Sequence, residues 1–181
     1  MLIEETHLKG CFVITPKIFG DDRGYFFESY NHRDFSTSLG FETSFIQDNQ
    51  SKSSSGVLRG LHYQKGEFAQ AKLVRVIKGK VLDVCVDIRK DSPTFGQSFS
   101  IELDELSQKQ LFIPRGFAHG FLVMEDNTIF SYKCDNYYNK EAESGIIYND
   151  STLNIDWNYP ENQIILSEKD KQLPTFENAF K

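Results

Sequence analysis

The segment VLRGLHYQ, residues 57–64, places an arginine and a histidine within a run that otherwise predicts a buried β-strand. A hydrophobic core has little use for either side chain, because charged groups are rarely buried without a partner. Imidazole titrates near neutral pH and can both take up and release a proton. The planar guanidinium group of arginine suits phosphate oxygens. His62 is therefore a candidate acid–base group and Arg59 a candidate anion-binding group.

The spacing of these two residues restricts how they can share a site. Arg59 and His62 are three positions apart, so in a straight strand their side chains point to opposite faces. Gly60 lies between them, and a glycine can accommodate a bulge that turns one side chain. If both groups reach one cavity, we expect a bulge at Gly60.

Two later strand-like segments also carry titratable groups among apolar neighbours. In FAHGFLV, residues 117–123, His119 shares a face with two phenylalanines and a valine. In TIFSYKC, residues 128–134, Tyr132 shares a face with a phenylalanine and a cysteine. Titratable side chains in apolar surroundings are candidates for a functional site. Each also fits a hydrogen-bonded residue of the core.

The elements that must position these groups are mostly strands. Short strand signals separated by turns dominate residues 11–150. VLDVCVDI, residues 81–88, alternates, with Asp83 and Asp87 on one face and four aliphatic residues on the other. Helical signals are sparse: residues 31–40 predict a short helix that stops at a glycine, and SEKDKQL near the C-terminus predicts another. This pattern indicates an all-β sandwich or jelly roll, which can hold a ligand between its sheets.

Length and composition set further limits. The chain has 181 residues and is expected to form one domain spanning residues 1–181. Aromatic residues make up 14% of it, which suits a β-fold with a lined cavity. The net charge of −6 disfavours nucleic acid and anionic membranes as partners. A phosphate-bearing ligand would therefore need a local basic cluster.

The cysteines and the N-terminus predict the compartment. Cys11, Cys85 and Cys134 are odd in number, far apart and form no CxxC pair, which disfavours a zinc site or a disulfide framework. The first ten residues carry acidic side chains and no apolar signal core, and no apolar run approaches the length of a membrane span. We expect a soluble protein of the reducing cytoplasm.

Longer motifs carry a family resemblance, and they are FIQDNQSKSSSGVLRGLHYQ, AQAKLVRVIKGKVLDVCVDIRKDSPTFG, QLFIPRGFAHGFLV and YKCDNYYNKEAESGIIYND. Their order and spacing resemble the dTDP-4-dehydrorhamnose 3,5-epimerase family, from DDRGYFFE at residues 21–28 to LSEKD at residues 166–170. The resemblance implies a cupin-like jelly-roll β-sandwich with a few short peripheral helices. It also implies a homodimer, no metal or organic cofactor, and a role in dTDP-rhamnose and cell-surface polysaccharide biosynthesis.

The implied reaction inverts C3 and C5 of a nucleotide-linked 4-keto-6-deoxy-hexose, converting dTDP-4-dehydro-6-deoxy-D-glucose to dTDP-4-dehydro-L-rhamnose. Removing a proton next to a ketone gives an enolate. The site therefore needs a base, a group that stabilises the enolate oxygen, and an acid on the opposite face. By resemblance, His62 is the base and Asp170 its hydrogen-bond partner. Lys72 stabilises charge near the carbonyl group, and Tyr132 returns the proton.

The remaining matched positions would hold the substrate. Arg59 resembles a diphosphate clamp, and Tyr138 resembles the aromatic residue on which the nucleobase stacks. The other implied nucleotide- or sugar-binding residues are Arg23, Glu28, Gln47, Asn49, His119, Glu143 and Lys169. Of these, Arg23 and Glu28 are expected from the neighbouring subunit of the dimer. The last two, Glu143 and Lys169, lie in polar segments where solvated charges are common.

Several of these residues also have structural interpretations. Ser167 and Asp170 have the spacing of a helix capping box, so the carboxyl group could serve the backbone as well as His62. Lys72 fits a solvated strand residue, and Tyr132 fits a core aromatic residue with a hydrogen-bonded hydroxyl group. Arg59 fits an ion pair with a nearby carboxylate.

Other functions also fit parts of the sequence. PRGFAH resembles half of the cupin metal signature, but the other half requires HxH and this chain has His-Tyr-Gln at residues 62–64. A metal-dependent cupin enzyme is therefore disfavoured. A non-catalytic nucleotide-sugar-binding module would not need a base, a lysine and an acid together. Related epimerases act on other nucleotide-linked keto-sugars, including GDP-heptoses, or invert one carbon, and the sequence leaves these alternatives open.

Overall fold

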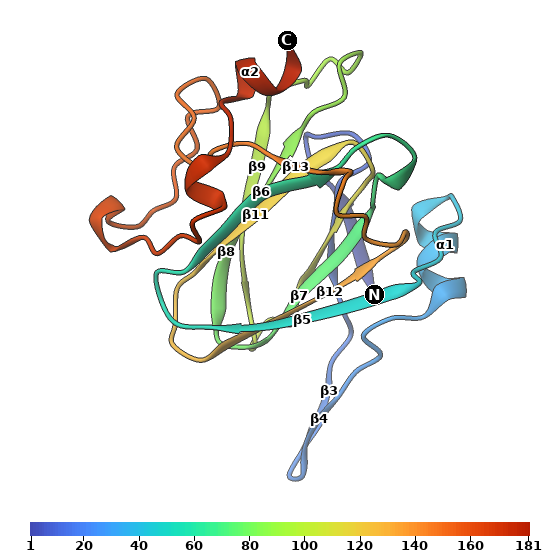
Figure 1. Cartoon of the computed structure of the whole chain (residues 1–181). Coiled ribbons are helices and arrows are strands. Elements are labelled where there is room, and N and C mark those ends of the chain that lie inside the picture. The colour runs from blue at the N-terminus through green and yellow to red at the C-terminus, as the bar shows by residue number, and fades with distance from the viewer.

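Two antiparallel sheets face each other in the computed structural model, which describes residues 1–181 (Figure 1). The six-stranded sheet contains, in spatial order, β1 (Leu2–Glu5), β2 (Phe12–Thr15), β10 (Gln110–Ile113), β7 (Lys72–Lys78), β12 (Thr128–Cys134) and β5 (Gln47–Ser53). The five-stranded sheet contains β13 (Glu143–Gly145), β6 (Leu58–Gln64), β11 (Phe117–Val123), β8 (Lys80–Asp87) and β9 (Ser98–Asp104). This arrangement confirms the predicted jelly-roll sandwich.

The helices are short and lie at the periphery of the sandwich (Figure 1). Helix α1 (His32–Leu39) begins after Asn31, whose side chain accepts a hydrogen bond from the Asp34 N–H, and ends at Gly40 with φ 77°. These signals confirm the helix predicted for residues 31–40. The other α-helix and the 3₁₀ turns are α2 (Phe176–Phe180), η1 (Gly66–Phe68), η2 (Glu161–Gln163) and η3 (Asp170–Gln172). None of the helices is long and apolar enough to cross a membrane.

The prediction of a helix for SEKDKQL is wrong. The segment forms only the 3₁₀ turn η3, and Leu173 is already extended with φ −64° and ψ 144°. Pro174 follows directly, and a proline disfavours the helical conformation in the residue before it. The helical signals therefore produce a single turn, and α2 starts afresh after Thr175, which caps it.

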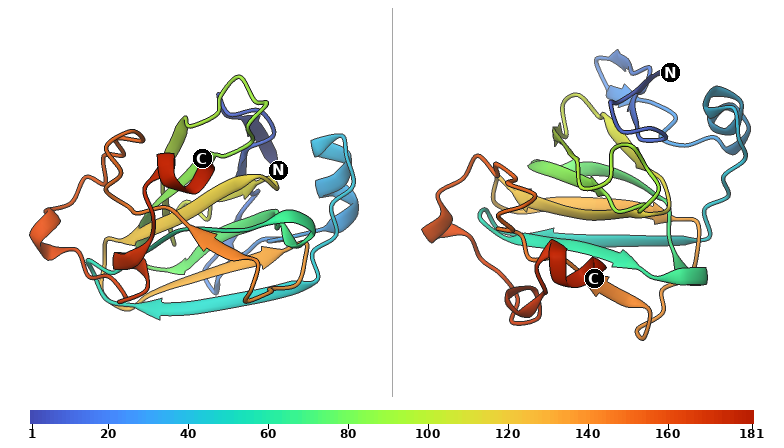
Figure 2. Two further views of the ribbon diagram at one scale, coloured as in Figure 1. Left: turned by 45° about the horizontal axis from the view of Figure 1, so that its top comes forward. Right: turned by 90° about the horizontal axis from the view of Figure 1, so that it is seen from above.

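Apolar side chains fill both faces of the five-stranded sheet. Between the sheets, the buried set includes Val74, Val76, Val81, Cys85, Leu103, Leu111, Phe117, Phe121, Val123 and Phe130. On the outer face, Leu82, Val84 and Val86 pack with Leu153 and Trp157 from the C-terminal segment. Figure 2 shows this segment lying along the outside of the sandwich. Asp83 and Cys85 consequently face the space between the two sheets.

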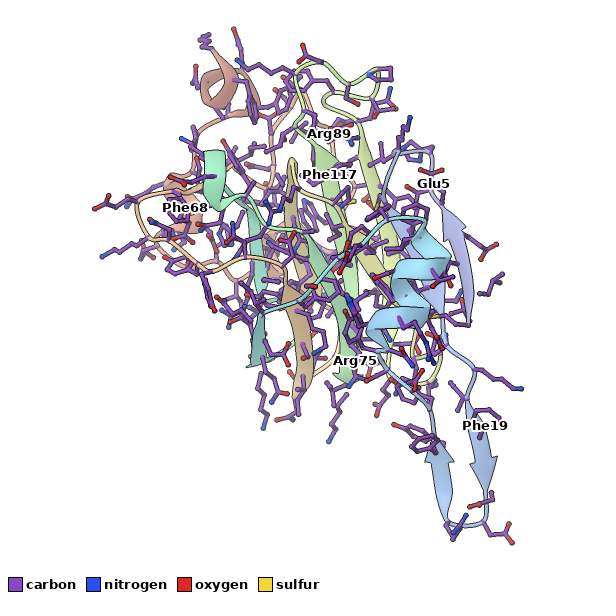
Figure 3. All side chains as sticks on the ribbon, turned by 90° about the vertical axis from the view of Figure 1, so that its right-hand side faces the viewer. Glu5, Phe19, Phe68, Arg75, Arg89 and Phe117 are labelled. Atoms are coloured by element: carbon purple, nitrogen blue, oxygen red, sulfur yellow. The ribbon has the colours of Figure 1, made fainter.

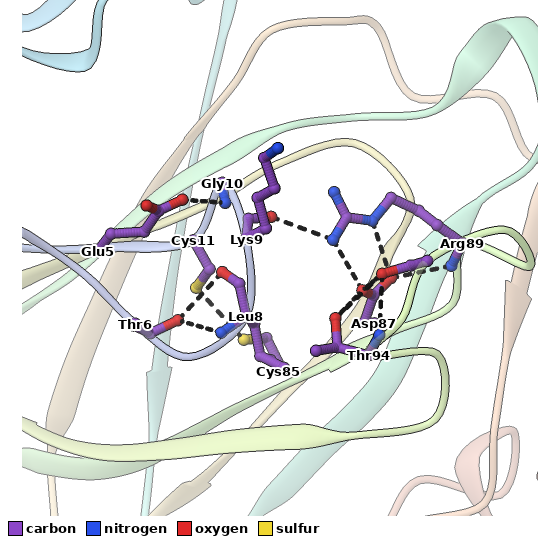
Figure 4. Close-up of polar contacts among 11 residues, drawn as sticks. Glu5, Thr6, Leu8, Lys9, Gly10, Cys11, Cys85, Asp87, Arg89 and Thr94 are labelled. Carbon is purple, nitrogen blue, oxygen red and sulfur yellow. Dashed lines mark hydrogen bonds and ion pairs between the residues drawn. The ribbon is translucent and has the colours of Figure 1, made fainter.

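A buried ion pair anchors the end of β8 to the N-terminal segment (Figure 4). The Arg89 guanidinium group donates to both Asp87 carboxylate oxygens, at 2.9 and 2.7 Å, and to the Lys9 carbonyl at 3.1 Å. The hydroxyl groups of Ser92 and Thr94 each donate to Asp87 at 2.6 Å. Burial raises the pKa of Asp87, but these hydrogen bonds outweigh it and lower that pKa to about 2. The carboxylate is therefore firmly ionised and holds the loop in place.

One hairpin extends away from the sandwich. Strands β3 (Phe19–Asp21) and β4 (Gly24–Phe26) pair only with each other, and Figure 3 shows Phe19 far from the residues of the body. Phe19, Tyr25 and Phe26 are 53%, 61% and 71% exposed. Single exposed aromatic residues are ordinary, whereas clusters of them are typical of interaction surfaces.

Candidate active site

His62 and Asp170 form a hydrogen-bonded pair between β6 and η3. The His62 Nε2 and Asp170 Oδ1 atoms lie 2.5 Å apart, and the two side chains are 29% and 5% exposed. Burial raises the pKa of Asp170, but the hydrogen bond from His62 helps to hold that pKa below its ordinary value. The Ser167 hydroxyl accepts a hydrogen bond from the Asp170 N–H at 3.1 Å. Half of the capping box is therefore present, while the Asp170 carboxylate points to His62.

The strand that carries His62 contains the expected irregularity. His62 pairs with His119 and Arg59 pairs with Phe121, so β6 has one residue more than β11 between these two pairs. Gly60 has φ 128°, and a Cβ atom there would lie 2.5 Å from the Cα of Gly120. Only glycine fits this close approach of the two strands. The bulge expected at Gly60 is confirmed.

Arg59 and His62 line one cavity of about 320 Å³ between the sheets. The other residues around it are Asn49, Gln50, Ser51, Lys72, His119, Phe121 and Tyr132. Arg59 is exposed and donates to the Ser53 hydroxyl group at 3.3 Å. No carboxylate pairs with Arg59, so its guanidinium group is available to an anion.

Lys72 and Tyr132 enter the cavity from the six-stranded sheet, opposite His62. In the strand register, Tyr132 on β12 lies opposite Asn49 on β5, and Lys72 on β7 lies opposite Cys134 on β12. The Lys72 Nζ atom lies 5.9 Å from the centre of the Tyr132 ring. Burial lowers the pKa of Lys72 and raises the pKa of Tyr132, because both charged forms lose hydration. Tyr132 is thus kept protonated at neutral pH.

A second carboxylate–histidine pair includes His119, which lines the inner cavity. Both carboxylate oxygens of Asp83 contact the His119 Nε2 atom, at 3.1 and 2.9 Å. His119 is 5% exposed and Asp83 fully buried. Burial lowers the pKa of His119, and the attraction of Asp83 opposes that change. Sequence reasoning missed Asp83 as a site residue, although alternation along β8 placed it on the face opposite Leu82.

An adjoining cavity of about 250 Å³ extends the site toward solvent, and it is lined in part by Gln47, Gln64, Gln70, Tyr138 and Glu143. Asn49, His62, Lys72 and Tyr132 line both cavities. The Tyr138 hydroxyl donates to Glu143 Oε2 at 2.8 Å, and Lys169 forms an ion pair with the same oxygen. The fold thus gathers eleven of the thirteen predicted residues in and beside two connected cavities.

Arg23 and Glu28 lie elsewhere in the chain. Arg23 occupies the turn of the β3–β4 hairpin, where its side chain is 90% exposed and pairs with Asp21. Glu28 lines a larger cavity of about 610 Å³ beside α1, together with Met1, Phe19 and other residues. That cavity contains none of the residues around His62, so its size does not make it the reactive site.

The two histidines are not arranged as metal ligands. His62 and His119 are paired positions on β6 and β11, but each ring has a carboxylate partner of its own. No group of three or more histidine, cysteine, aspartate or glutamate side chains is placed to hold a metal ion.

The fold and this cavity define the class of protein: a cupin-like sandwich with a hydrogen-bonded histidine–carboxylate pair on one wall of its cavity and a protonated tyrosine and a lysine on the other. Such a site suits proton transfer next to a carbonyl group. The family model described as dTDP-4-dehydrorhamnose 3,5-epimerase matches residues 5–178. The chain belongs to this family of isomerases.

Individual relatives agree over nearly the whole chain. The dTDP-4-dehydrorhamnose 3,5-epimerase of Salmonella typhimurium is 47% identical over 183 residues, covering 99% of this chain and 98% of the relative. The crystal structure of the enzyme from Elizabethkingia anophelis superposes with a TM-score of 0.96 at 52% identity, covering 100% and 99% of the two chains. The Legionella pneumophila enzyme in complex with dTDP-4-keto-L-rhamnose has a TM-score of 0.93 at 46% identity, covering 97% and 93%.

Proposed function

We propose that the protein is an epimerase that inverts C3 and C5 of dTDP-4-dehydro-6-deoxy-D-glucose and so produces dTDP-4-dehydro-L-rhamnose. The observation that carries the proposal is the His62–Asp170 pair on one wall of the cavity, opposite Tyr132 and Lys72 on the other. The near-full-length similarity to enzymes of this name supports the same substrate.

His62 is the proposed base for both carbons. Its Nε2 atom is hydrogen-bonded to Asp170, so in the neutral ring the Nε2–H donates and Nδ1 is left free to accept a proton. The Asp170 carboxylate then stabilises the imidazolium that forms. The protein supplies the carboxylate already buried and ionised, so this stabilisation needs no rearrangement during the reaction.

Tyr132 is the proposed acid, and its position explains inversion. His62 and Tyr132 come from opposite sheets, so a sugar ring held between them meets the base on one face and the acid on the other. Burial raises the pKa of Tyr132, which keeps a proton available for the enolate. Lys72 is the proposed cation that stabilises the enolate oxygen, because a buried ammonium group acts strongly at low dielectric.

The proposed nucleotide site spans both cavities. Arg59 in the inner cavity clamps the diphosphate, and the exposed ring of Tyr138 in the outer cavity stacks with the nucleobase. Gln47, Asn49, Glu143 and Lys169 supply hydrogen bonds and charge for the nucleotide and the sugar, and His119 binds the sugar from the inner wall.

We infer that the protein works as a homodimer. Arg23 and Glu28 lie outside the cavity of their own chain, and the exposed aromatic hairpin that carries Arg23 extends away from the body. A second copy would cover this hairpin and receive both residues at its site. The chain acts as a single catalytic domain, residues 1–181, in the cytoplasm, without a metal or organic cofactor.

A deuterium exchange experiment tests the function. The protein is incubated in D2O with a panel of nucleotide-linked 4-keto-sugars, including GDP-linked heptoses, and the products are analysed by NMR. We expect incorporation at C3 and C5 of the dTDP-linked hexose. Deuterium exchange only with another nucleotide sugar would change the proposed substrate. Exchange at one carbon only would change the proposed product. In both cases the proposed role of His62 in proton abstraction would stand.

A further inference from the structure

Strand β5 presents a row of polar side chains to the space between the sheets. β5 is the edge strand of the six-stranded sheet, and its exposed residues alternate with inward-facing ones. The inward-facing residues are Gln47, Asn49, Ser51 and Ser53. Such a row is unexpected on an inner face, where apolar residues normally fill the core. It therefore points to a ligand.

One member of this row lacks a protein partner. Gln47 donates to Asn49 at 3.2 Å, and Ser53 accepts from Arg59 at 3.3 Å. The Ser51 hydroxyl is buried and has no hydrogen-bond partner. Directly opposite it across the strands is Phe130, whose ring has nothing to offer a hydroxyl group. Buried polar groups are almost always hydrogen-bonded, so this exception requires a reason.

The position of Ser51 gives a reason for its unpaired hydroxyl group. It lines the 320 Å³ cavity with His62, Lys72 and Tyr132. Along β5 it lies between Asn49, which pairs with Tyr132, and Ser53, which contacts Arg59. Serine has three staggered χ1 positions, so rotation about a single bond redirects its hydroxyl group. Ser51 thus occupies the stretch between the proposed acid and the proposed diphosphate clamp.

We propose that Ser51 binds a ring hydroxyl group of the sugar and selects for it, an inference that rests on the proposed function. The substrate carries hydroxyl groups at C3, which is one of the reacting carbons, and at the neighbouring C2. A serine hydroxyl can both donate and accept, so it pairs with either group. A site built to hydrogen-bond a hydroxyl group discriminates against an analogue that lacks it. Ser51 is then a specificity-determining residue.

Equilibrium binding of two ligands tests this proposal. One ligand is dTDP-6-deoxyglucose, which has a hydroxyl group in place of the 4-ketone and does not react, and the other is dTDP, which lacks the sugar. Ser51→Ala should weaken binding of the sugar nucleotide about 3–10-fold, as expected for one lost hydrogen bond, and leave dTDP binding unchanged. The unliganded variant should unfold at the same or a higher temperature, because no protein hydrogen bond is lost.

Ser36→Ala is the matched control. Ser36 carries the other buried hydroxyl group without a partner, but it lies on α1 and lines neither cavity around His62. This substitution should change neither affinity. If Ser51→Ala fails to fold, Ser51→Cys, whose side chain is slightly larger and offers only a weak donor, should show the same selective loss.

Monodeoxy analogues identify the contact. The wild-type protein should bind either the 2-deoxy or the 3-deoxy analogue of dTDP-6-deoxyglucose 3–10-fold more weakly than the parent ligand, and Ser51→Ala should no longer make that distinction. Equal sugar-nucleotide binding by Ser51→Ala and wild type would overturn the proposal while the proposed function stands. A wild-type protein that neither binds these ligands nor exchanges deuterium would instead reject the proposed function.

Discussion

The His62 Nε2 and Asp170 Oδ1 atoms lie 2.5 Å apart although 108 residues separate them in the chain. The contact forms because the C-terminal segment folds over the outer face of the five-stranded sheet and then places η3 beside β6. Packing on the outside of the sandwich therefore positions a carboxylate for chemistry on the inside.

His62→Asn tests the proposed base. Asparagine cannot take up a proton at neutral pH, and its shorter side chain does not reach the position of Nε2, so the hydrogen bond to Asp170 is lost as well. The loss of a general base typically lowers the rate by about 10²–10⁴-fold, and we expect the upper end because one group serves two carbons. Deuterium exchange at C3 and C5 should vanish at saturating substrate, while substrate affinity changes little. Exchange that persists at either carbon would assign another base there.

Arg59→Ala should fail in a different way. Removing one charged hydrogen-bonding group costs about 1.5–3 kcal/mol of binding free energy, which corresponds to roughly 10–100-fold weaker binding of dTDP. Lys9→Ala removes an exposed cation that lines neither cavity around His62 and should change this affinity much less. Calorimetric titration with dTDP measures both variants. An unaltered dTDP affinity in Arg59→Ala would remove this residue from the diphosphate site.

Asp87 predicts a pH dependence of stability. Its pKa is about 2 in the folded protein against an ordinary value of 3.8, so it stabilises the folded state above pH 4 and loses this contribution as the pH falls toward 2. The shift corresponds to roughly 2 kcal/mol. Urea unfolding at pH 7 and pH 3 should show a smaller loss of stability on acidification for Asp87→Asn than for wild type. Asp91→Asn, an exposed change in the same loop, should follow wild type.

Activity should be independent of divalent metals. The sequence lacks the HxH half of the cupin metal signature, and both cavity histidines already have carboxylate partners. Product formation after exhaustive chelation should equal that of untreated protein, and elemental analysis should find no stoichiometric transition metal. Loss of activity with EDTA and its return with one divalent ion would favour a metal-dependent cupin.

Strand periodicity was sufficient to place several of the chemical side chains. The alternation of side chains along their strands placed His119 and Tyr132 on inward faces. Gly60 predicted the bulge that brings Arg59 and His62 to one cavity. These features are local, because the side-chain period of a strand and the freedom of glycine depend only on neighbouring residues.

Features set by distant parts of the chain were harder to predict. Local signals gave Asp170 a capping role, and only the family resemblance paired it with His62. The alternation of side chains along β8 placed Asp83 on the opposite face from its aliphatic neighbours. It did not indicate which of the two faces lines the cavity. Both faces are buried, because the C-terminal segment covers the outer one, and Asp83 lies on the inner one.

Tyr132→Phe tests the division of labour between the two sheets. The proposed base on β6 is untouched by this substitution, so proton abstraction should continue, while return of a proton from the opposite face should slow. We expect epimerised product to fall much more, by about 10²-fold or greater, than incorporation of solvent deuterium at the substrate carbon. Tyr148→Phe removes a hydroxyl group that bonds Glu161 outside the cavity, and it should leave both rates unchanged. NMR in D2O measures both rates in one sample. Wild-type product formation by Tyr132→Phe would make Tyr132 a packing residue and leave the acid to another group on that wall, with Lys72 the next to test.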